Sequence, residues 1–186
     1  MENKLIILPD NSQQVKPKKH DSKKINTQKE KKVRVVAQTD KWQQVLQPEY
    51  YTTQIQYDIL SSQNTENTEL PVYKMMIQQI QQKINGYKGQ DLEKSLFSAT
   101  DFVNLDYTVD LIKKSVLKCY YCKQDMKILY EHVREPKQWS LERIDNNYGH
   151  NKNNVEIACL SCNLRRKTMY HERFIFTKQL NIVKNG

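Results

Sequence analysis

Cys119-Tyr120-Tyr121-Cys122 and Cys159-Leu160-Ser161-Cys162 together contain all four cysteines of this 186-residue chain. Two C-x2-C pairs can close a tetrahedral Zn(II) site with four thiolates, which leaves no open position and is therefore structural. A redox dithiol and chance pairing are the alternatives, but two identical spacings argue against chance. The motifs predict a zinc site that supplies folding free energy to a polar domain. The long insertion between Cys122 and Cys159 exceeds that of a compact zinc ribbon.

The chain is basic and polar. Lys and Arg number 30 against 21 Asp and Glu, which gives a net charge of +9, and the mean hydropathy is −0.84. This surplus favours a polyanionic partner, nucleic acid before a membrane surface, with a basic surface kept for solubility as the plain alternative.

No segment approaches the roughly 18–20 apolar residues of a membrane span. The apolar stretch at residues 5–8 is too short for the core of a signal peptide. We therefore expect an intracellular protein in a reducing compartment, cytoplasm or nucleus, and not a secreted one. In such a compartment paired cysteines bind metal more often than they form disulfides.

The composition changes along the chain and predicts four parts. Residues 1–70 are expected to form a basic, largely disordered N-terminal arm, because nine basic residues face two acidic ones between Lys16 and Arg34. Such an arm binds nucleic acid, acts as a localisation signal or is a solvated linker. Apolar residues between Trp42 and Leu60 could dock part of it. Residues 71–117 are expected as a helical lead-in, 118–171 as the zinc-bound core and 172–186 as a basic extension.

The periodicity of apolar residues gives the expected elements. A helix begins at Pro71 and stops at Asn85-Gly86, and another covers about residues 107–117 with Asp106 as its N-cap. Residues 126–130, 140–144 and 155–158 are expected as strands, 145–154 as a polar loop and 164–170 as a basic helix. The tail at 172–183 fits a helix or a strand. The predicted fold class is α+β.

The core resembles the HNH, or ββα-metal, nucleases, in the zinc-knuckle subgroup similar to phage recombination endonuclease VII. The resemblance rests on residues 140–146 (SLERIDN), 149–150 (GH), 154–155 (NV) and 159–163 (CLSCN). It covers about residues 117–170. Its specific feature is the order of the two C-x2-C pairs, which we call the first and second knuckle, with the loop Asn and the Cys-Asn step. It implies a zinc-stapled ββα-metal (HNH/His-Me finger) core that hydrolyses phosphodiester bonds in DNA with Mg(II) or Mn(II).

The resemblance also implies roles for individual residues. Glu142 and Asn163 would bind the catalytic cation, and both offer the oxygen ligands that a hard cation prefers. Asn154 would hold the loop and orient the general base. Contacts to phosphates would come from Arg165, Arg166 and Lys167. Taken singly, Glu142 could instead be an exposed carboxylate paired with an Arg, and Asn163 a helix cap.

Arg143 departs from the family pattern, which has the general-base His directly after the acidic ligand. A guanidinium cannot take up a proton at working pH, but it can hold a phosphate. The base could be His150, with His132 and His171 as weaker candidates, or hydroxide on the metal could attack without a dedicated base. Cleavage could also have been lost.

Two functions follow from these alternatives. The first is a metal-dependent HNH-type endonuclease acting on branched or duplex DNA. The second is a catalytically weak or inactive zinc module that binds DNA or RNA, or that has a structural role in an assembly. The oligomeric state stays open, with a dimer among the options.

Overall fold

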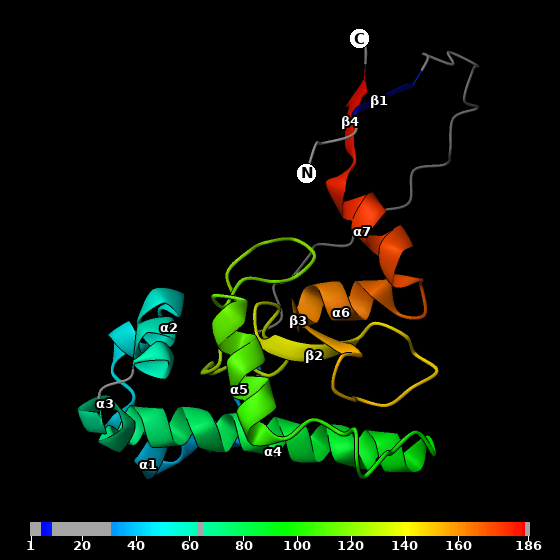
Figure 1. Ribbon diagram of the computed structural model, residues 1–186. Coiled ribbons are helices and arrows are strands. Elements are labelled where there is room, and N and C mark those ends of the chain that lie inside the picture. Colours follow the sequence, from blue (N-terminus) through cyan, green and yellow to red (C-terminus); the bar gives the residue numbers. More distant parts are fainter. Residues whose placement is uncertain (1–4, 9–30, 63–64, 185–186) are drawn as a thin grey trace, which may run out of the picture.

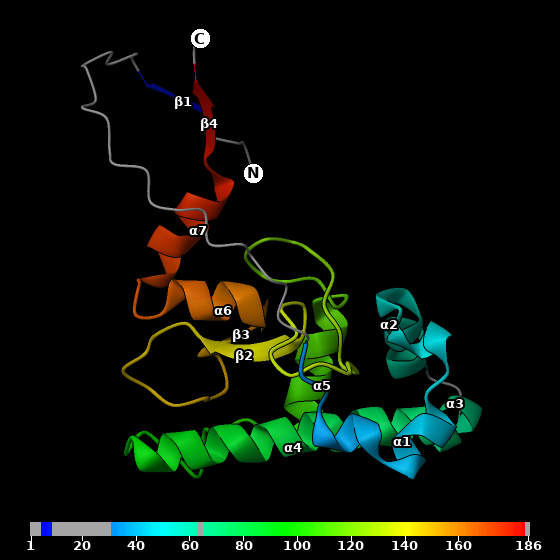
Figure 2. The same ribbon diagram turned by 180° about the vertical axis from the view of Figure 1, so that it is seen from behind.

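The computed structural model describes residues 5–8, 31–62 and 65–184. The described part is α+β, with seven α-helices and small two-stranded sheets (Figures 1 and 2). In chain order the elements are β1 (Leu5–Leu8), η1 (Val35–Gln38), α1 (Asp40–Val45), η2 (Pro48–Tyr51), α2 (Thr53–Ser61), α3 (Thr65–Glu69), α4 (Pro71–Glu93), α5 (Leu105–Lys114), β2 (Trp139–Arg143), β3 (Val155–Cys159), α6 (Leu160–Arg166), α7 (His171–Gln179) and β4 (Asn181–Lys184). Within these residues no helix is both long and apolar enough to cross a membrane.

Helix α4 forms the base on which α5 and the β2–β3 hairpin stand (Figure 1). Its buried face includes Val72, Met76 and Ile80 at the predicted helical spacing. The predicted stop at Asn85-Gly86 is wrong, because the helix continues to Glu93. Gly86 faces open space, so it lowers the helix propensity without requiring a turn. The additional turns carry Asp91 toward the hairpin.

The segment at residues 31–62 is ordered, contrary to the expectation of a disordered arm over 1–70. Trp42, Leu46 and Leu60 are buried in the core, which confirms that apolar residues dock this segment. Arg34 donates hydrogen bonds to the Tyr130 carbonyl oxygen (3.0 Å) and to Gln79 Oε1 (2.7 Å). The rest of the basic run, residues 16–30, lies outside the described residues.

The expected strand at residues 126–130 is not formed. Its backbone instead binds the buried amide of Gln56, whose Oε1 accepts from the amides of Ile128 (2.7 Å) and Leu129 (3.0 Å). Gln56 Nε2 donates to the Leu129 carbonyl oxygen (3.1 Å). One side chain from α2 thus satisfies backbone groups that a partner strand would otherwise pair.

The hairpin and the helix after it form the centre of the fold. β2 and β3 are antiparallel, from the pair Trp139 and Cys159 to the pair Arg143 and Val155. Both strands lie within one residue of their predicted bounds. Helix α6 begins directly after β3, at residue 160 rather than the predicted 164, because Cys159 is its N-cap.

Two other expectations are settled by local contacts. Helix α5 begins at residue 105, since the Asn104 side chain, rather than Asp106, accepts from the Tyr107 amide (2.9 Å). The undecided tail is a helix, α7, followed by the strand β4, which pairs in parallel with β1.

Candidate functional site

The four cysteines converge at the base of the hairpin. Their sulfur atoms all lie within 4.8 Å of one another. The separation of the sulfurs of Cys122 and Cys159 is 3.9 Å, close to the edge of a tetrahedron with Zn–S bonds of about 2.3 Å. The cluster could therefore hold a zinc ion, as the C-x2-C spacing predicts.

Backbone amides support the cysteine cluster. The Cys159 amide donates to the sulfur of Cys119 (3.2 Å), and the Cys162 amide donates to the sulfur of Cys159 (3.4 Å). The hydrogen bond between the two side chains lowers the pKa of Cys119 and raises the pKa of Cys159. The cluster thus favours a thiolate at Cys119, which is the form that binds metal.

A cavity of about 230 Å³ adjoins the hairpin. Strand β2, the loop after it, α4 and the α6 region all contribute to its wall. Four of the predicted catalytic residues line it together: Glu142, Arg143, His150 and Asn163. Lys94 and Lys167 also line it. Together with Arg143 they place three cationic side chains around one carboxylate, that of Glu142. This charge favours an anionic ligand.

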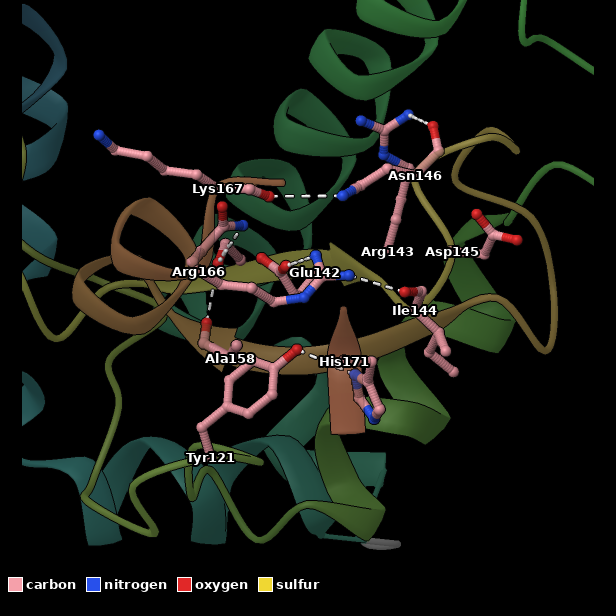
Figure 3. Close-up of polar contacts among 12 residues, drawn as sticks. Tyr121, Glu142, Arg143, Ile144, Asp145, Asn146, Ala158, Arg166, Lys167 and His171 are labelled. Atoms are coloured by element: carbon pink, nitrogen blue, oxygen red, sulfur yellow. Dashed lines mark hydrogen bonds and ion pairs between the residues drawn. The ribbon is translucent and has the colours of Figure 1, made fainter. Parts of the chain in front are cut away.

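Glu142 is buried against Arg166 of α6 (Figure 3). Arg166 Nη1 donates to Glu142 Oε1, and its Nη2 donates to the Ile144 carbonyl oxygen at 2.7 Å. Burial raises the pKa of Glu142 to about 7, and Arg166 acts in the opposite direction. Glu142 is therefore buried, not exposed as the plain alternative expected, but it is paired with an arginine, as that alternative did expect.

The same contact corrects the expectation for Arg166. Its side chain is 1% exposed, so it does not reach a phosphate at the surface. Its guanidinium instead binds Glu142 and the Ile144 carbonyl oxygen at the end of β2. Arg165 and Lys167 are exposed, as a contact to nucleic acid requires, and Lys167 lies at the pocket.

Asn163 joins the cysteine cluster to the pocket, because it follows Cys162 directly in α6. Its Nδ2 donates to the Ser140 hydroxyl (3.2 Å) and to the Leu141 carbonyl oxygen (3.3 Å). These bonds fix the amide group on β2. The Oδ1 atom keeps its acceptor capacity, and it is the atom that could bind a cation.

His150 is held by Asp91 of α4, a residue that no sequence pattern singled out. The Nδ1 atom of His150 lies 2.8 Å from Asp91 Oδ1, and the His150 amide donates to Asp91 Oδ2 (2.6 Å). A carboxylate partner requires the proton on Nδ1, which leaves Nε2 as a proton acceptor. Burial lowers the pKa of His150 below its ordinary value of 6.5, against the raising effect of Asp91.

Gly149 makes this contact possible. A Cβ atom at this position would lie 2.5 Å from the Leu96 carbonyl oxygen and 2.7 Å from Asp91 Oδ2. Only glycine permits so close an approach of the loop to α4. The Gly-His step could have signalled a constrained histidine, but nothing in the sequence pointed to a partner 59 residues upstream.

The loop is held by Asn154, as predicted. Its Nδ2 donates to the carbonyl oxygens of Asp145 and Gly149, both at 3.0 Å, and its Oδ1 accepts from the Asp145 amide at 2.9 Å. Asn154 thus fixes the residue before His150, while Asp91 orients the ring. Arg143 Nη1 donates to the carbonyl oxygens of Asn146 and Tyr148, at 3.4 and 3.2 Å.

The weaker histidine candidates lie elsewhere. His171 Nδ1 is 3.0 Å from the Tyr121 hydroxyl, beside the first knuckle (Figure 3). The backbone of His132 forms an isolated antiparallel β-bridge with Val33 of the N-terminal segment. Neither residue lines the pocket that contains Glu142 and Asn163.

Comparison of the chain with protein-family models, with curated proteins and with solved structures gave no match.

Proposed function

We propose that this protein is a metal-dependent HNH-type DNA endonuclease that hydrolyses phosphodiester bonds, with a structural zinc on its four cysteines. The observation that carries the proposal is the pocket in which Glu142, Asn163 and His150 meet three cationic side chains. Oxygen ligands for a cation, a neutral imidazole and positive charge are groups with which a metal-dependent enzyme can hydrolyse a phosphodiester.

Glu142 and Asn163 would hold a divalent cation, Mg(II) or Mn(II). When bound, such a cation neutralises charge on the phosphate and stabilises the leaving oxygen. Arg166 holds the Glu142 carboxylate in position, while Ser140 and Leu141 hold the Asn163 amide. Both ligands are therefore fixed by neighbouring groups of β2 and α6.

His150 would act as the general base. Its Nε2 takes a proton from a water molecule as the water oxygen attacks phosphorus, and the bond from phosphorus to the leaving sugar oxygen breaks. The Asp91 carboxylate orients the ring and stabilises the imidazolium that forms. Arg143, Lys94 and Lys167 would contact the phosphate and balance its developing charge.

A second candidate function is a zinc module that binds nucleic acid without cutting it. The Glu142–Arg166 contact favours this alternative, because a carboxylate already paired with a guanidinium is a weaker ligand for a cation. This candidate predicts salt-sensitive binding to DNA or RNA and no cleavage with any divalent cation.

Nicking of supercoiled plasmid and cleavage of branched DNA, with Mg(II) or Mn(II), test the proposal. Glu142→Gln keeps an acceptor for Arg166 but removes the charge, so we expect cleavage to fall by at least about 10²-fold. The melting temperature should also fall, because the buried Arg166 loses its counter-charge, and circular dichroism verifies that the variant is folded. Glu135→Gln, on a partly exposed acceptor of a backbone amide outside the pocket, is the control and should cut as the parent does. Equal cleavage by Glu142→Gln would refute the site.

A further inference from the structure

Five lysines surround two adjoining hollows away from the pocket. The first hollow, of about 380 Å³, is lined by Lys114, Lys118 and Lys123. The second, of about 420 Å³, is lined by Lys118 again, with Lys127 and Lys137. Because Lys118 belongs to both, the hollows form one continuous surface, which we name the lysine surface.

The lysine surface is more positive than the chain as a whole. Its only carboxylates are Glu156 in the first hollow and Asp125 in the second, two against five lysines, whereas the chain has 21 acidic residues against 30 basic ones. Asp125 pairs with Lys118 at 2.8 Å, but both side chains are more than half exposed, so this ion pair is weak.

The other four lysines are little neutralised by neighbouring carboxylates. Lys123 opposes the rise in the pKa of Glu156 that burial causes, so these two groups lie near each other. Among the described residues, Lys114, Lys127 and Lys137 form no ion pair. The plain explanation for Lys114 is its place at the C-terminal end of α5, where the helix dipole favours a cation. That explanation does not cover the four lysines that lie outside helices.

The first hollow of the lysine surface and the pocket both adjoin the β2–β3 hairpin. Glu142 of β2 lines the pocket, and Glu156, its partner in register on β3, lines the first hollow. Each of these two sites thus has one of the two paired strands in its wall, with α5 beside the hairpin (Figure 1). Because neighbouring strands are about 4.8 Å apart, a polymeric ligand at the pocket also reaches the first hollow.

The kind of cation indicates what is bound. Neither hollow is lined by arginine or histidine, and lysine contacts phosphate as a point charge rather than reading a base through a fixed pair of hydrogen bonds. We propose that the lysine surface binds the phosphate backbone of the nucleic-acid substrate, outside the cleavage pocket and without regard to sequence. This inference rests on the proposed nuclease function for the identity of the polymer.

The test compares two triple variants with matched chemistry. The first triple variant replaces Lys114, Lys118 and Lys123 by Gln. Lys114 forms no ion pair, Lys118 pairs with Asp125, and Lys123 lies 4.9 Å from the centroid of the Tyr120 ring. The control triple variant replaces Lys41, Lys74 and Lys88 by Gln. Lys41 is exposed, Lys74 pairs with Glu69, and Lys88 lies 5.1 Å from the centroid of the Phe97 ring. Both triples lower the net charge equally.

Binding to fluorescent duplexes of unrelated sequence is measured from 50 to 200 mM salt without added magnesium, so that binding is separated from cleavage. We expect the first triple to bind at least about tenfold more weakly than the control, with a salt slope smaller by up to about 3, for all duplexes alike. Melting temperatures verify folding, and the exposed pair Lys114→Gln and Lys137→Gln, expected to weaken binding in the same direction, replaces the triple if it does not fold.

Equal binding by the two triples would overturn the lysine surface, and so would a loss confined to one sequence. A parent protein that binds through these lysines but cleaves nothing would keep the lysine surface and remove the nuclease proposal. DNA cleavage that does not depend on these lysines would keep the nuclease proposal and remove the lysine surface.

Discussion

Under the proposed function, His150 and Asp91 supply the base at the residue scale, because Arg143 stands where the nucleases that the core resembles have their histidine. The residue comes from the loop between the strands, and its partner comes from a helix outside the region of family resemblance. Burial keeps the imidazole neutral to lower pH than in water, so it can accept a proton near pH 7.

Replacing Asp91 by Asn gives a prediction about pH. In the parent with saturating Mg(II), which keeps Glu142 ionised, cleavage should rise with pH through a value below 6.5 and then stay level, because only neutral His150 accepts a proton. Asp91 raises the pKa of His150, so Asp91→Asn should shift this rise to lower pH and reduce the plateau by about 10²–10⁴-fold. Initial rates of plasmid nicking between pH 5 and 9 measure both effects. An unchanged profile would exclude His150 as the base.

The elements show why the sequence predicted some parts of the fold and not others. The hairpin was predictable because its two short strand segments, the polar loop between them and the second C-x2-C motif lie within 24 consecutive residues, 139–162. The missing strand at 126–130 was not, because Gln56, which binds its backbone, is 72 residues away in the chain. Likewise, Asn85-Gly86 carries a stop signal, but contacts of the following turns with the loop keep α4 helical to Glu93.

Two glycines in different elements should respond oppositely to alanine. Gly149→Ala places a Cβ against the Leu96 carbonyl oxygen and Asp91, so it should destabilise the protein by about 1–3 kcal/mol and separate the loop from α4. Gly86→Ala meets open space on α4 and should stabilise it by about 0.5–1 kcal/mol. Urea unfolding of both variants gives the two free energies. A Gly149→Ala protein as stable as the parent would contradict the close packing of the loop.

For the whole molecule, the cysteine cluster joins the segments that surround the pocket. The first knuckle follows α5, and the second begins α6, which carries Asn163 and Arg166. The sequence predicted this cluster because cysteine spacing alone reports a metal site. It could not predict the Glu142–Arg166 pair, since several cations near Glu142 in sequence and space were equally suitable partners.

Removing the metal should therefore affect both folding and activity. We expect one zinc per chain, and its removal by a strong chelator should lower the melting temperature and abolish cleavage, because metal binding contributes directly to folding. Elemental analysis and circular dichroism before and after chelation measure this, and returning zinc should restore both. Cys122→Ser should lose zinc in the same assay. A chain that retains its fold and cooperative melting without any metal would contradict a structural zinc.

The proposed function depends on a second cation in the pocket, which diffraction can locate directly. Crystals grown with zinc and soaked in Mn(II) should show an anomalous peak about 2.1 Å from oxygens of both Glu142 and Asn163, with zinc at the four cysteines. The peak should be absent from Glu142→Gln crystals. A pocket without manganese in the parent, with Glu142 still held by Arg166, would contradict the account.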